Sequence, residues 1–211
     1  MKRTNEILQY VIGPTVLDIG CAGQDALKEH SKDWLHGLLL KNFPQVVGID
    51  ISAEDINRLE NLGFQNLYIQ SAEDLNLPST FNTIVAGEVI EHLSNPGVFL
   101  EKAYKHLIYD GRLIVTTPNP FSALHILYAF FKYPKTCSND EHTCWFCPST
   151  LRSLLQRFRF QEIYFDYVND YETINNFSWR FKIFTVLIRL LGPILPRRLR
   201  CNAMLFVFVK N

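Results

Sequence analysis

The chain of 211 residues is long enough for one large domain or two small ones, and we expect a single domain over 1–211. Hydrophobic residues make up 47% and charged residues 20%, which excludes a disordered, collagen-like or coiled-coil chain. The net charge is zero, but residues 1–110 carry 8 Lys and Arg against 15 Asp and Glu, and residues 111–211 carry 13 against 6. From Thr173 to the end the chain has seven Lys and Arg and no Asp or Glu, and this tail favours an anionic surface as a partner.

Apolar runs alternate with helical patterns through most of the chain, which is typical of parallel βαβ units. The predicted strands cover 15–19, 46–50, 67–70, 83–86, 112–116, 162–168 and 203–209. The predicted helices cover 25–40, 53–63, 96–107 and 149–158. Ser52 is the expected N-cap of the second helix, because its side chain can accept a hydrogen bond from the first turn. The pattern predicts an α/β fold.

The first predicted strand ends in a loop that combines a carboxylate with two glycines, Asp18-Ile19-Gly20-Cys21-Ala22-Gly23. A turn of this kind into a helix lets main-chain N–H groups approach a ligand closely. A dinucleotide fingerprint would need glycine where Ala22 and Asp25 stand, which disfavours an NAD or nucleotide-sugar enzyme. Asp50 ends the second strand, where a carboxylate can accept both hydroxyls of a ribose.

This loop, the acid after the second strand and Ala72-Glu73-Asp74 after the third resemble the ordered motifs of class I S-adenosylmethionine-dependent methyltransferases. The resemblance covers roughly residues 10–170 and the last strand. It implies a Rossmann-like, doubly wound sheet of seven strands in the order 3-2-1-4-5-7-6, with the last strand antiparallel. It implies that Asp18 orients the methionine amino end, that Asp50 holds the ribose, and that the cofactor is bound by Asp18, Gly20, Cys21, Gly23, Asp50, Ile51, Ala72, Glu73 and Gly87.

The segment Glu88-Val89-Ile90-Glu91-His92 follows the fourth strand. If a helix begins here, Glu88, Glu91 and His92 share one face of its first turn, where they could hold Mg²⁺ or another divalent cation or supply a catalytic base. The segment looks like the E-x-x-E-H of ubiquinone-biosynthesis O-methyltransferases and small-RNA 2'-O-methyltransferases, and this resemblance implies His142 as a further metal ligand. Alternatively, Glu88 caps the helix and His92 binds a main-chain carbonyl.

Two further features carry candidate site residues. Asn119 follows the fifth strand, at the sheet edge where open α/β sheets bind ligands, and is a candidate substrate contact or a plain turn former. Four potential zinc ligands lie within eleven residues, namely Cys137, His142, Cys144 and Cys147. Because a second C-x-x-C is missing, we favour packing over zinc at this cluster.

The segments 121–148 and 171–200 are apolar and are predicted to cover the substrate. Within the second, Ser178, Lys182, Thr185 and Arg189 form a narrow polar stripe at helical spacing, which fits a membrane interface, a homodimer contact or packing on the domain. The window 183–195 is too short and interrupted to span a bilayer. The N-terminus does not resemble a secretory signal, so we expect a cytoplasmic protein, peripheral to the inner face of a membrane, with reduced cysteines.

The resemblance implies a methyltransferase that uses S-adenosylmethionine. The apolar segments favour an oxygen of a hydrophobic small molecule or of a lipid-, quinol- or glycolipid-like acceptor, with Glu88, Glu91 and His92 as catalytic residues. The alternatives are 2'-O-methylation of RNA and S-adenosylmethionine binding without catalysis. Nucleic acid is disfavoured, because the sequence shows no aromatic platform interleaved with Lys and Arg.

Overall fold

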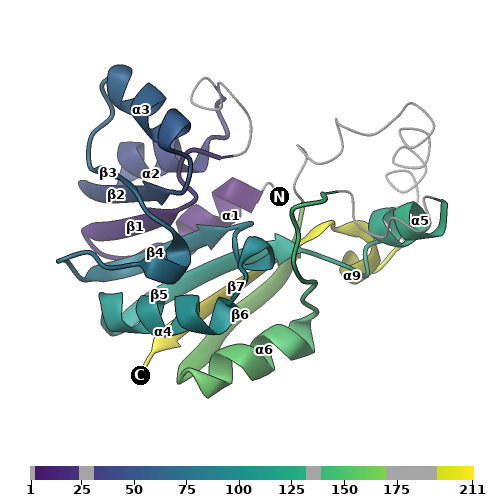
Figure 1. Cartoon of the computed structure of the whole chain (residues 1–211). Coiled ribbons are helices and arrows are strands. Elements are labelled where there is room, and N and C mark those ends of the chain that lie inside the picture. Colours follow the sequence, from purple (N-terminus) through teal and green to yellow (C-terminus); the bar gives the residue numbers. More distant parts are fainter. Residues whose placement is uncertain (1–2, 24–30, 132–138, 170–193) are drawn as a thin grey trace.

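The structure is a computed structural model that describes residues 3–23, 31–131, 139–169 and 194–211 (Figure 1). Seven strands form one sheet in the order β3-β2-β1-β4-β5-β7-β6. They are β1 (Thr15–Ile19), β2 (Gln45–Asp50), β3 (Leu67–Ile69), β4 (Phe81–Gly87), β5 (Leu107–Pro118), β6 (Phe160–Val168) and β7 (Ala203–Lys210). Strand β7 runs antiparallel to β5 and β6, and the other neighbours are parallel. The predicted strand order and the antiparallel last strand are confirmed.

The helices are α1 (Arg3–Tyr10), α2 (Leu35–Asn42), α3 (Ala53–Asn61), η2 (Ala72–Asp74), η3 (Ile90–His92), α4 (Pro96–His106), α5 (Ala123–Phe131), α6 (Pro148–Arg157) and α9 (Arg197–Arg200). The sequence did not predict α1, whose pattern is short and polar. Of the predicted helix 25–40, residues 25–30 lie outside the described residues, and residues 31–34 are not helical, so the helix begins only at Leu35. The polar stripe within 171–200 also lies outside the described residues. Among the described helices, none combines the length and the hydrophobicity that crossing a membrane requires.

Buried side chains of the central strands alternate between the two faces of the sheet, as expected for strands covered by helices on both sides. In β4, Ile84 and Ala86 pack in the core beneath α4 and α6, whereas Val85 packs with α1 and α2. The same alternation places Phe206 of β7 in the first core and Leu205 in the second. Figure 1 shows α4 and α6 along one face of this three-layer arrangement.

The carboxyl ends of the parallel strands bring the predicted site loops to one edge of the sheet. Strands β1 and β4 are paired in register from Val16 opposite Thr83 to Ile19 opposite Ala86. After β2, Ser52 caps α3 as predicted, since its Oγ accepts a hydrogen bond of 3.2 Å from the main-chain nitrogen of Asp55. This cap fixes the direction in which the chain leaves Asp50.

Candidate functional site

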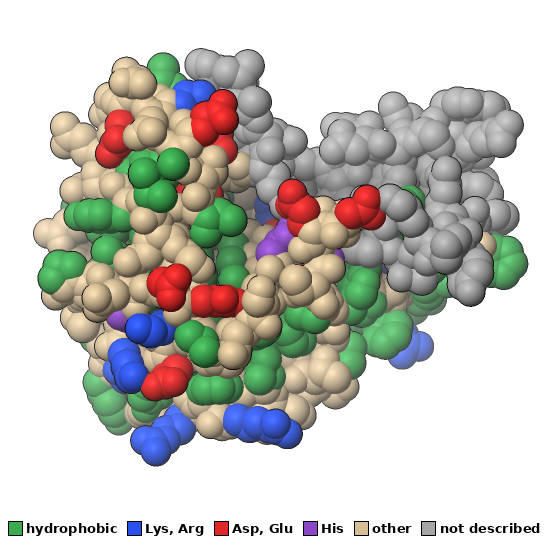
Figure 2. All heavy atoms as spheres, viewed as in Figure 1, with side chains coloured by type: hydrophobic (Ala, Val, Ile, Leu, Met, Phe, Trp, Pro, Cys, Tyr) green, Lys and Arg blue, Asp and Glu red, His purple; other side chains and the backbone are tan. Residues whose placement is uncertain are grey.

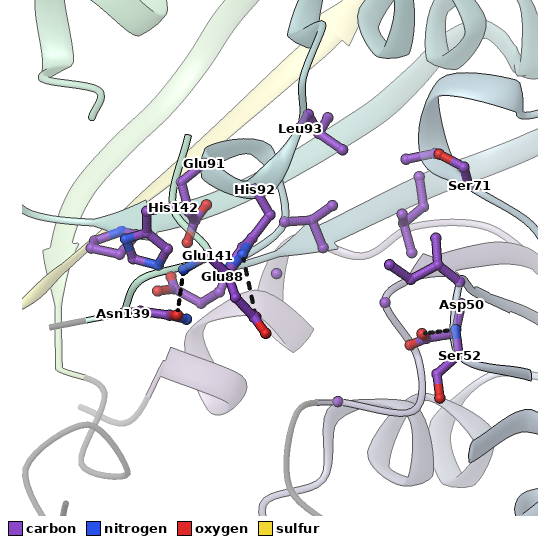
Figure 3. Close-up of a pocket in the computed structure, with 18 of the residues that line it drawn as sticks. Asp50, Ser52, Ser71, Glu88, Glu91, His92, Leu93, Asn139, Glu141 and His142 are labelled. Carbon is purple, nitrogen blue, oxygen red and sulfur yellow. Dashed lines mark hydrogen bonds and ion pairs between the residues drawn. The ribbon is translucent and has the colours of Figure 1, made fainter. Parts of the chain in front are cut away.

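A cavity of about 1100 Å³ opens at this edge of the sheet (Figure 3). Pockets for one drug-sized ligand usually occupy roughly 300–1,000 Å³, so this volume suits a cofactor together with a second molecule. The predicted site residues that line it are Gly20, Gly23, Asp50, Ile51, Ala72, Glu73, Gly87, Glu88, Glu91, His92 and His142. In Figure 3, Asp50, Ser52 and Ser71 lie on one side of the cavity, and Glu88, Glu91, His92 and His142 lie on the other.

The loop after β1 is fixed by glycine conformations and by Asp50. Gly20 and Gly23 have φ angles of 76° and 70°, in the left-handed region that glycine adopts without steric cost. The main-chain nitrogen of Gly20 donates to the carbonyl of Ile49. One carboxylate oxygen of Asp50 accepts from the main-chain nitrogen of Ala22 at 3.1 Å, and the other from that of Ser52 at 3.0 Å. Asp50 therefore connects the β1 and β2 loops and still lines the cavity.

Asp18 and Cys21, which the resemblance implies as cofactor-binding residues, have their side chains beneath the loop rather than in the cavity lining. Asp18 is 2% exposed, and its Oδ2 lies 3.0 Å from Nδ1 of His36 in α2. Burial raises the pKa of the Asp18 carboxyl, whereas the hydrogen bond from His36 lowers it. Cys21 is also 2% exposed and packs with Trp34, and burial raises the pKa of its thiol. Both side chains support the loop from beneath, and neither lines the cavity.

The segment after β4 differs from the predicted helical turn. Glu88 has a φ of 59°, and the short helix η3 begins only at Ile90, so Glu88 does not share a helix face with Glu91 and His92. The main-chain nitrogen of Glu88 donates to the carbonyl of Thr116, and its carboxylate lies 3.5 Å from a guanidinium nitrogen of Arg3. Arg3 also lines the cavity, and sequence analysis did not identify it because α1 lacks a recognisable motif.

Glu91, His92 and His142 offer ligand atoms that all lie within 4.8 Å of one another. Both carboxylate oxygens of Glu91 are buried, and neither accepts a well-formed hydrogen bond in the described part of the chain. Burial and the neighbouring Glu88 raise the pKa of the Glu91 carboxyl, although its own main-chain N–H and the hydroxyl of Thr117 lie close enough to lower it. Burial lowers the pKa of His92. Burial, together with the neighbouring His92 and His125, lowers the pKa of His142 to about 4. The neutral imidazoles of His92 and His142 and the buried carboxyl group of Glu91 therefore lie close enough to bind one ion together.

The alternative zinc ligands are directed toward different partners. The sulfur of Cys144 lies 3.8 Å from the carbonyl of Glu91, beneath η3. The sulfur of Cys147 lies 3.1 Å from the hydroxyl of Ser149, at the start of α6. Cys137 falls in 132–138, outside the described residues. The cluster of potential ligands found in the described ranges contains none of these cysteines.

Asn119 is fully buried, which corrects the expectation that it contacts substrate. Its side-chain nitrogen donates to the carbonyls of Arg198 and Cys201 at 2.7 and 2.8 Å, so the amide holds the chain that leads into β7. The main-chain carbonyl of Asn119 instead accepts a bond of 2.8 Å from Nδ1 of His125. His125 lines the cavity, and sequence analysis missed it because it lies within an apolar run.

Comparison with known proteins agrees with this geometry. Residues 5–163 match the family described as "Methyltransferase domain". The chain is 34% identical over 122 residues to a ubiquinone biosynthesis O-methyltransferase of Xylella fastidiosa, covering 54% of this chain and 46% of that one. It is 28% identical over 127 residues to the enzyme of the same name from Nitrobacter winogradskyi, covering 56% and 43%. The chain thus spans less than half the length of these curated relatives.

Solved structures share the fold at low sequence identity. A SAM-dependent methyltransferase from Archaeoglobus fulgidus superposes with a TM-score of 0.68 at 20% identity, covering 99% of this chain and 91% of that one. Magnesium protoporphyrin IX methyltransferase from Synechocystis PCC 6803, solved with bound S-adenosylhomocysteine, gives 0.64 at 14% identity, covering 99% and 82%. At these identities the likeness establishes the fold.

Proposed function

Because the chain belongs to the methyltransferase-domain family, as a class I S-adenosylmethionine-dependent methyltransferase, we propose that it methylates an oxygen of a hydrophobic small molecule or quinol- or lipid-like acceptor. The observation that carries the proposal is the cavity that joins the glycine loop and Asp50 to Glu91, His92 and His142. The relatives named as ubiquinone biosynthesis O-methyltransferases support the oxygen and the quinol class. Since they are matched over less than half their length, the acceptor remains part of the proposal.

The cavity's charge suits a cationic cofactor. Its acidic lining residues are Asp50, Asp55, Glu73, Glu88, Glu91, Asp140 and Glu141, and Arg3 is the one Lys or Arg among its lining residues within the described ranges. An acidic cleft attracts the positive sulfonium and repels a polyanion, which favours a small acceptor over RNA. In Figure 2, acidic and histidine side chains gather at the hollow of this face.

The cofactor would lie across the carboxyl ends of β1, β2 and β4. We assign the ribose hydroxyls to Asp50, because its carboxylate retains acceptor capacity beyond its two main-chain bonds. The adenine would lie beside Ile51, Ala72 and Glu73, and the methionine end beside Gly20 and Gly87, with Arg3 near its carboxylate. In this pose the sulfonium methyl points toward the part of the cavity that the histidines line.

A divalent cation fits the residues of the Glu91, His92 and His142 cluster. A buried carboxylate without a hydrogen bond is costly unless a cation or proton compensates it, and neutral imidazoles are ready ligands for divalent metals. We propose that these three residues hold such an ion, with Glu88 outside the ligand set. When bound, the ion would act as a Lewis acid toward the acceptor oxygen.

Metal titration of matched glutamate variants tests this ligand set. Glu91→Gln should weaken Mn²⁺ binding at least tenfold in calorimetry, because it removes the anionic ligand. Glu88→Gln changes a glutamate that lines the same cavity but lies outside the cluster, and should bind Mn²⁺ nearly as the wild type does. Equal affinity of the wild type and Glu91→Gln would refute the assignment, and so would a wild type that binds no divalent metal.

We further propose that the acceptor is taken up from an anionic membrane surface. Four apolar side chains around α5 and α9 are strongly exposed, namely Phe121, Ile126, Phe130 and Ile194, with Phe130 77% and Ile194 82% exposed. Helix α9 packs against α5 and carries the exposed residues Arg197, Arg198 and Arg200. In Figure 2, green side chains protrude at this end of the molecule with a blue one beside them. Apolar groups flanked by cations complement anionic lipid headgroups.

Transfer of labelled methyl groups into a cell extract tests the proposed function. The purified protein, S-adenosylmethionine labelled in the methyl group, and extract are incubated and then separated into organic, nucleic-acid and water-soluble fractions. Label in the organic fraction supports the proposal. Label in RNA would instead support 2'-O-methylation, and cofactor binding without any transfer would support the non-catalytic alternative.

A further inference from the structure

His125 occupies the wall of the cavity as part of α5, on an element separate from the Glu91, His92 and His142 cluster. Its side chain is 5% exposed, and its ring packs edge-on against Trp145 with 5.2 Å between the ring centroids. Trp145 in turn packs against His142 at 5.8 Å. His125 is therefore held in one orientation next to the candidate metal ligands without belonging to their set.

The hydrogen bonds of His125 determine which ring nitrogen carries the proton. Nδ1 lies 2.8 Å from the main-chain carbonyl oxygen of Asn119, which can only accept. Nδ1 must therefore be the protonated nitrogen, because two acceptors would otherwise face each other. The hydroxyl of Ser122 lies 3.0 Å from Nδ1 and accepts the main-chain N–H of His125 at 3.2 Å, which braces the same geometry. Nε2 is then the nitrogen with the free electron pair.

The carbonyl that orients His125 is itself immobilised. The main-chain nitrogen of Asn119 donates a hydrogen bond of 2.8 Å to the carbonyl of Asn202. Its buried side-chain nitrogen donates to the carbonyls of Arg198 and Cys201. Its carbonyl also accepts from the main-chain nitrogen of Ser122 at 3.1 Å. This arrangement is the one by which proteins commonly set the tautomer of a functional histidine, with one ring nitrogen bound to a fixed carbonyl and the other presented to a ligand.

We propose that His125 is a catalytic residue whose Nε2 accepts the proton of the acceptor hydroxyl during methyl transfer. This inference rests on the proposed function. The acceptor oxygen forms a bond to the methyl carbon, the carbon–sulfur bond breaks with its electron pair passing to sulfur, and the hydroxyl proton moves to Nε2. The products are the methyl ether, S-adenosylhomocysteine and an imidazolium that later releases its proton to water.

The other histidines of the cavity are less suited to this role. If His92 and His142 bind a cation, their ring nitrogens are engaged, and His92 also lies 4.0 Å from the carboxylate of Glu141. The hydrogen bonds of the His125 ring within the described ranges are made by Nδ1, and His125 lines the cavity. Burial lowers the pKa of His125, opposed by its bond to Asn119, so the imidazole is neutral near pH 7. Among the described residues, His142 interacts electrostatically with His125, and the helix α9, which carries three arginines, packs against α5.

A histidine-to-asparagine exchange separates proton acceptance from support of the fold. In His125→Asn, the side-chain amide can keep the bond to the Asn119 carbonyl, but no group replaces Nε2. We expect kcat to fall by roughly 10²- to 10⁴-fold, with the KM for S-adenosylmethionine changed less than threefold. We also expect the variant's rate to rise with pH as the acceptor hydroxyl ionises without a base. The probe acceptor is an alkylated hydroquinone such as 2-decylhydroquinone.

His106→Asn is the matched control. His106 is also buried and also binds a main-chain carbonyl through Nδ1, that of Lys102 at 2.8 Å, but it lies outside the cavity lining. It should keep kcat within threefold. If His125→Asn likewise keeps kcat within threefold and the wild-type pH profile, the proposal is overturned while the methyltransferase function stands.

The tautomer gives a readout that does not depend on activity. In the wild type bound to S-adenosylhomocysteine, long-range ¹H–¹⁵N spectra should show the His125 ring, assigned by its absence in His125→Asn, protonated at Nδ1 and unprotonated at Nε2. A ring protonated at Nε2 would overturn the proposal. If the wild type transfers no methyl group to the hydroquinone, it is the quinol acceptor of the proposed function that fails, and the spectrum still decides the orientation of His125.

Discussion

Asp50 joins the two loops that would enclose the cofactor, since its carboxylate binds main-chain nitrogens on both sides. Asp50→Asn keeps the size of the side chain but removes its charge and half of its acceptor capacity. A hydrogen bond to a charged group contributes about 1.5–3 kcal/mol, so we expect S-adenosylmethionine to bind roughly 10- to 100-fold more weakly in calorimetry. Asp74→Asn, exposed and outside the cavity lining, should leave the affinity unchanged. Equal affinities of the two variants would refute the role of Asp50.

Asp18 and His36 form a buried pair beneath the same loop. His36→Leu would leave the Asp18 carboxylate buried without its partner, at a cost of about 3 kcal/mol in the free energy of unfolding, measured by urea denaturation. Replacing Asp18 with Asn in the same chain should recover part of this loss, because a neutral amide is less costly to bury. A His36→Leu protein as stable as the wild type would contradict the pairing.

The sequence predicted the orientation of individual side chains least well. Spacing places Asp18, Asn119 and Glu88 near strand ends, but it does not say which way each side chain turns. Asp18 turns to His36, a partner eighteen residues away, and Asn119 turns to the chain before β7. Glu88 adopts a left-handed conformation that no helical periodicity anticipates. His125 lies in an apolar run, so its role depends on contacts that only the folded chain reveals.

At the scale of elements, the central strands were predictable because β1, β2 and β4 are buried apolar runs that end at or just before Gly or Asp. Strand β2 ends at Asp50, as expected, and β1 matches its predicted bounds of Thr15–Ile19. Strand β5 begins earlier than predicted, at Leu107, because it pairs with Phe81 of β4 before an irregularity in the register. Asp110, with a φ of 59°, lies in the part of β5 where this register shifts.

The start of α6 makes Cys147 the more acidic of two neighbouring cysteines. Hydrogen bonds from the hydroxyls of Ser149 and Thr150 lower the pKa of the Cys147 thiol to about 7, whereas burial raises that of Cys144. Thiolates are the nucleophilic form, so Cys147 should react faster with iodoacetamide, with a rate that rises to a plateau above about pH 7. Mass spectrometry of timed digests measures both sites. Faster alkylation of Cys144 would contradict these environments.

At the scale of the whole molecule, charge and apolar exposure coincide at the end formed by α5 and α9. The protein should co-sediment with vesicles of phosphatidylglycerol at low salt, and less at high salt, because headgroup attraction is screened. Phe130→Ser combined with Ile194→Ser should reduce the bound fraction severalfold. Tyr109→Ser alters a side chain that is 73% exposed in β5, away from α5 and α9, and should have no effect. The membrane proposal would be contradicted if the wild type did not bind the vesicles. It would also be contradicted if the double substitution left the bound fraction unchanged.

A chain of zero net charge thus has an acidic cleft and a basic, apolar end, which suit the two partners proposed above. The acids that line the cavity favour a sulfonium cofactor, and the arginines of α9 favour anionic lipid. Composition indicated the two charged halves, whereas the fold places acids from both halves around the cavity and the arginines of α9 beside α5.

The most direct test of the account follows the methyl carbon itself. The protein is incubated with S-adenosylmethionine carrying ¹³C in the methyl group and with an organic extract of cell membranes, and the organic phase is examined by ¹³C NMR. The account predicts an enzyme-dependent methoxyl signal in that phase, strongly reduced in Asp50→Asn and His125→Asn. A labelled carbon bound to nitrogen, sulfur or carbon, or found only in RNA, would contradict O-methylation of a hydrophobic acceptor.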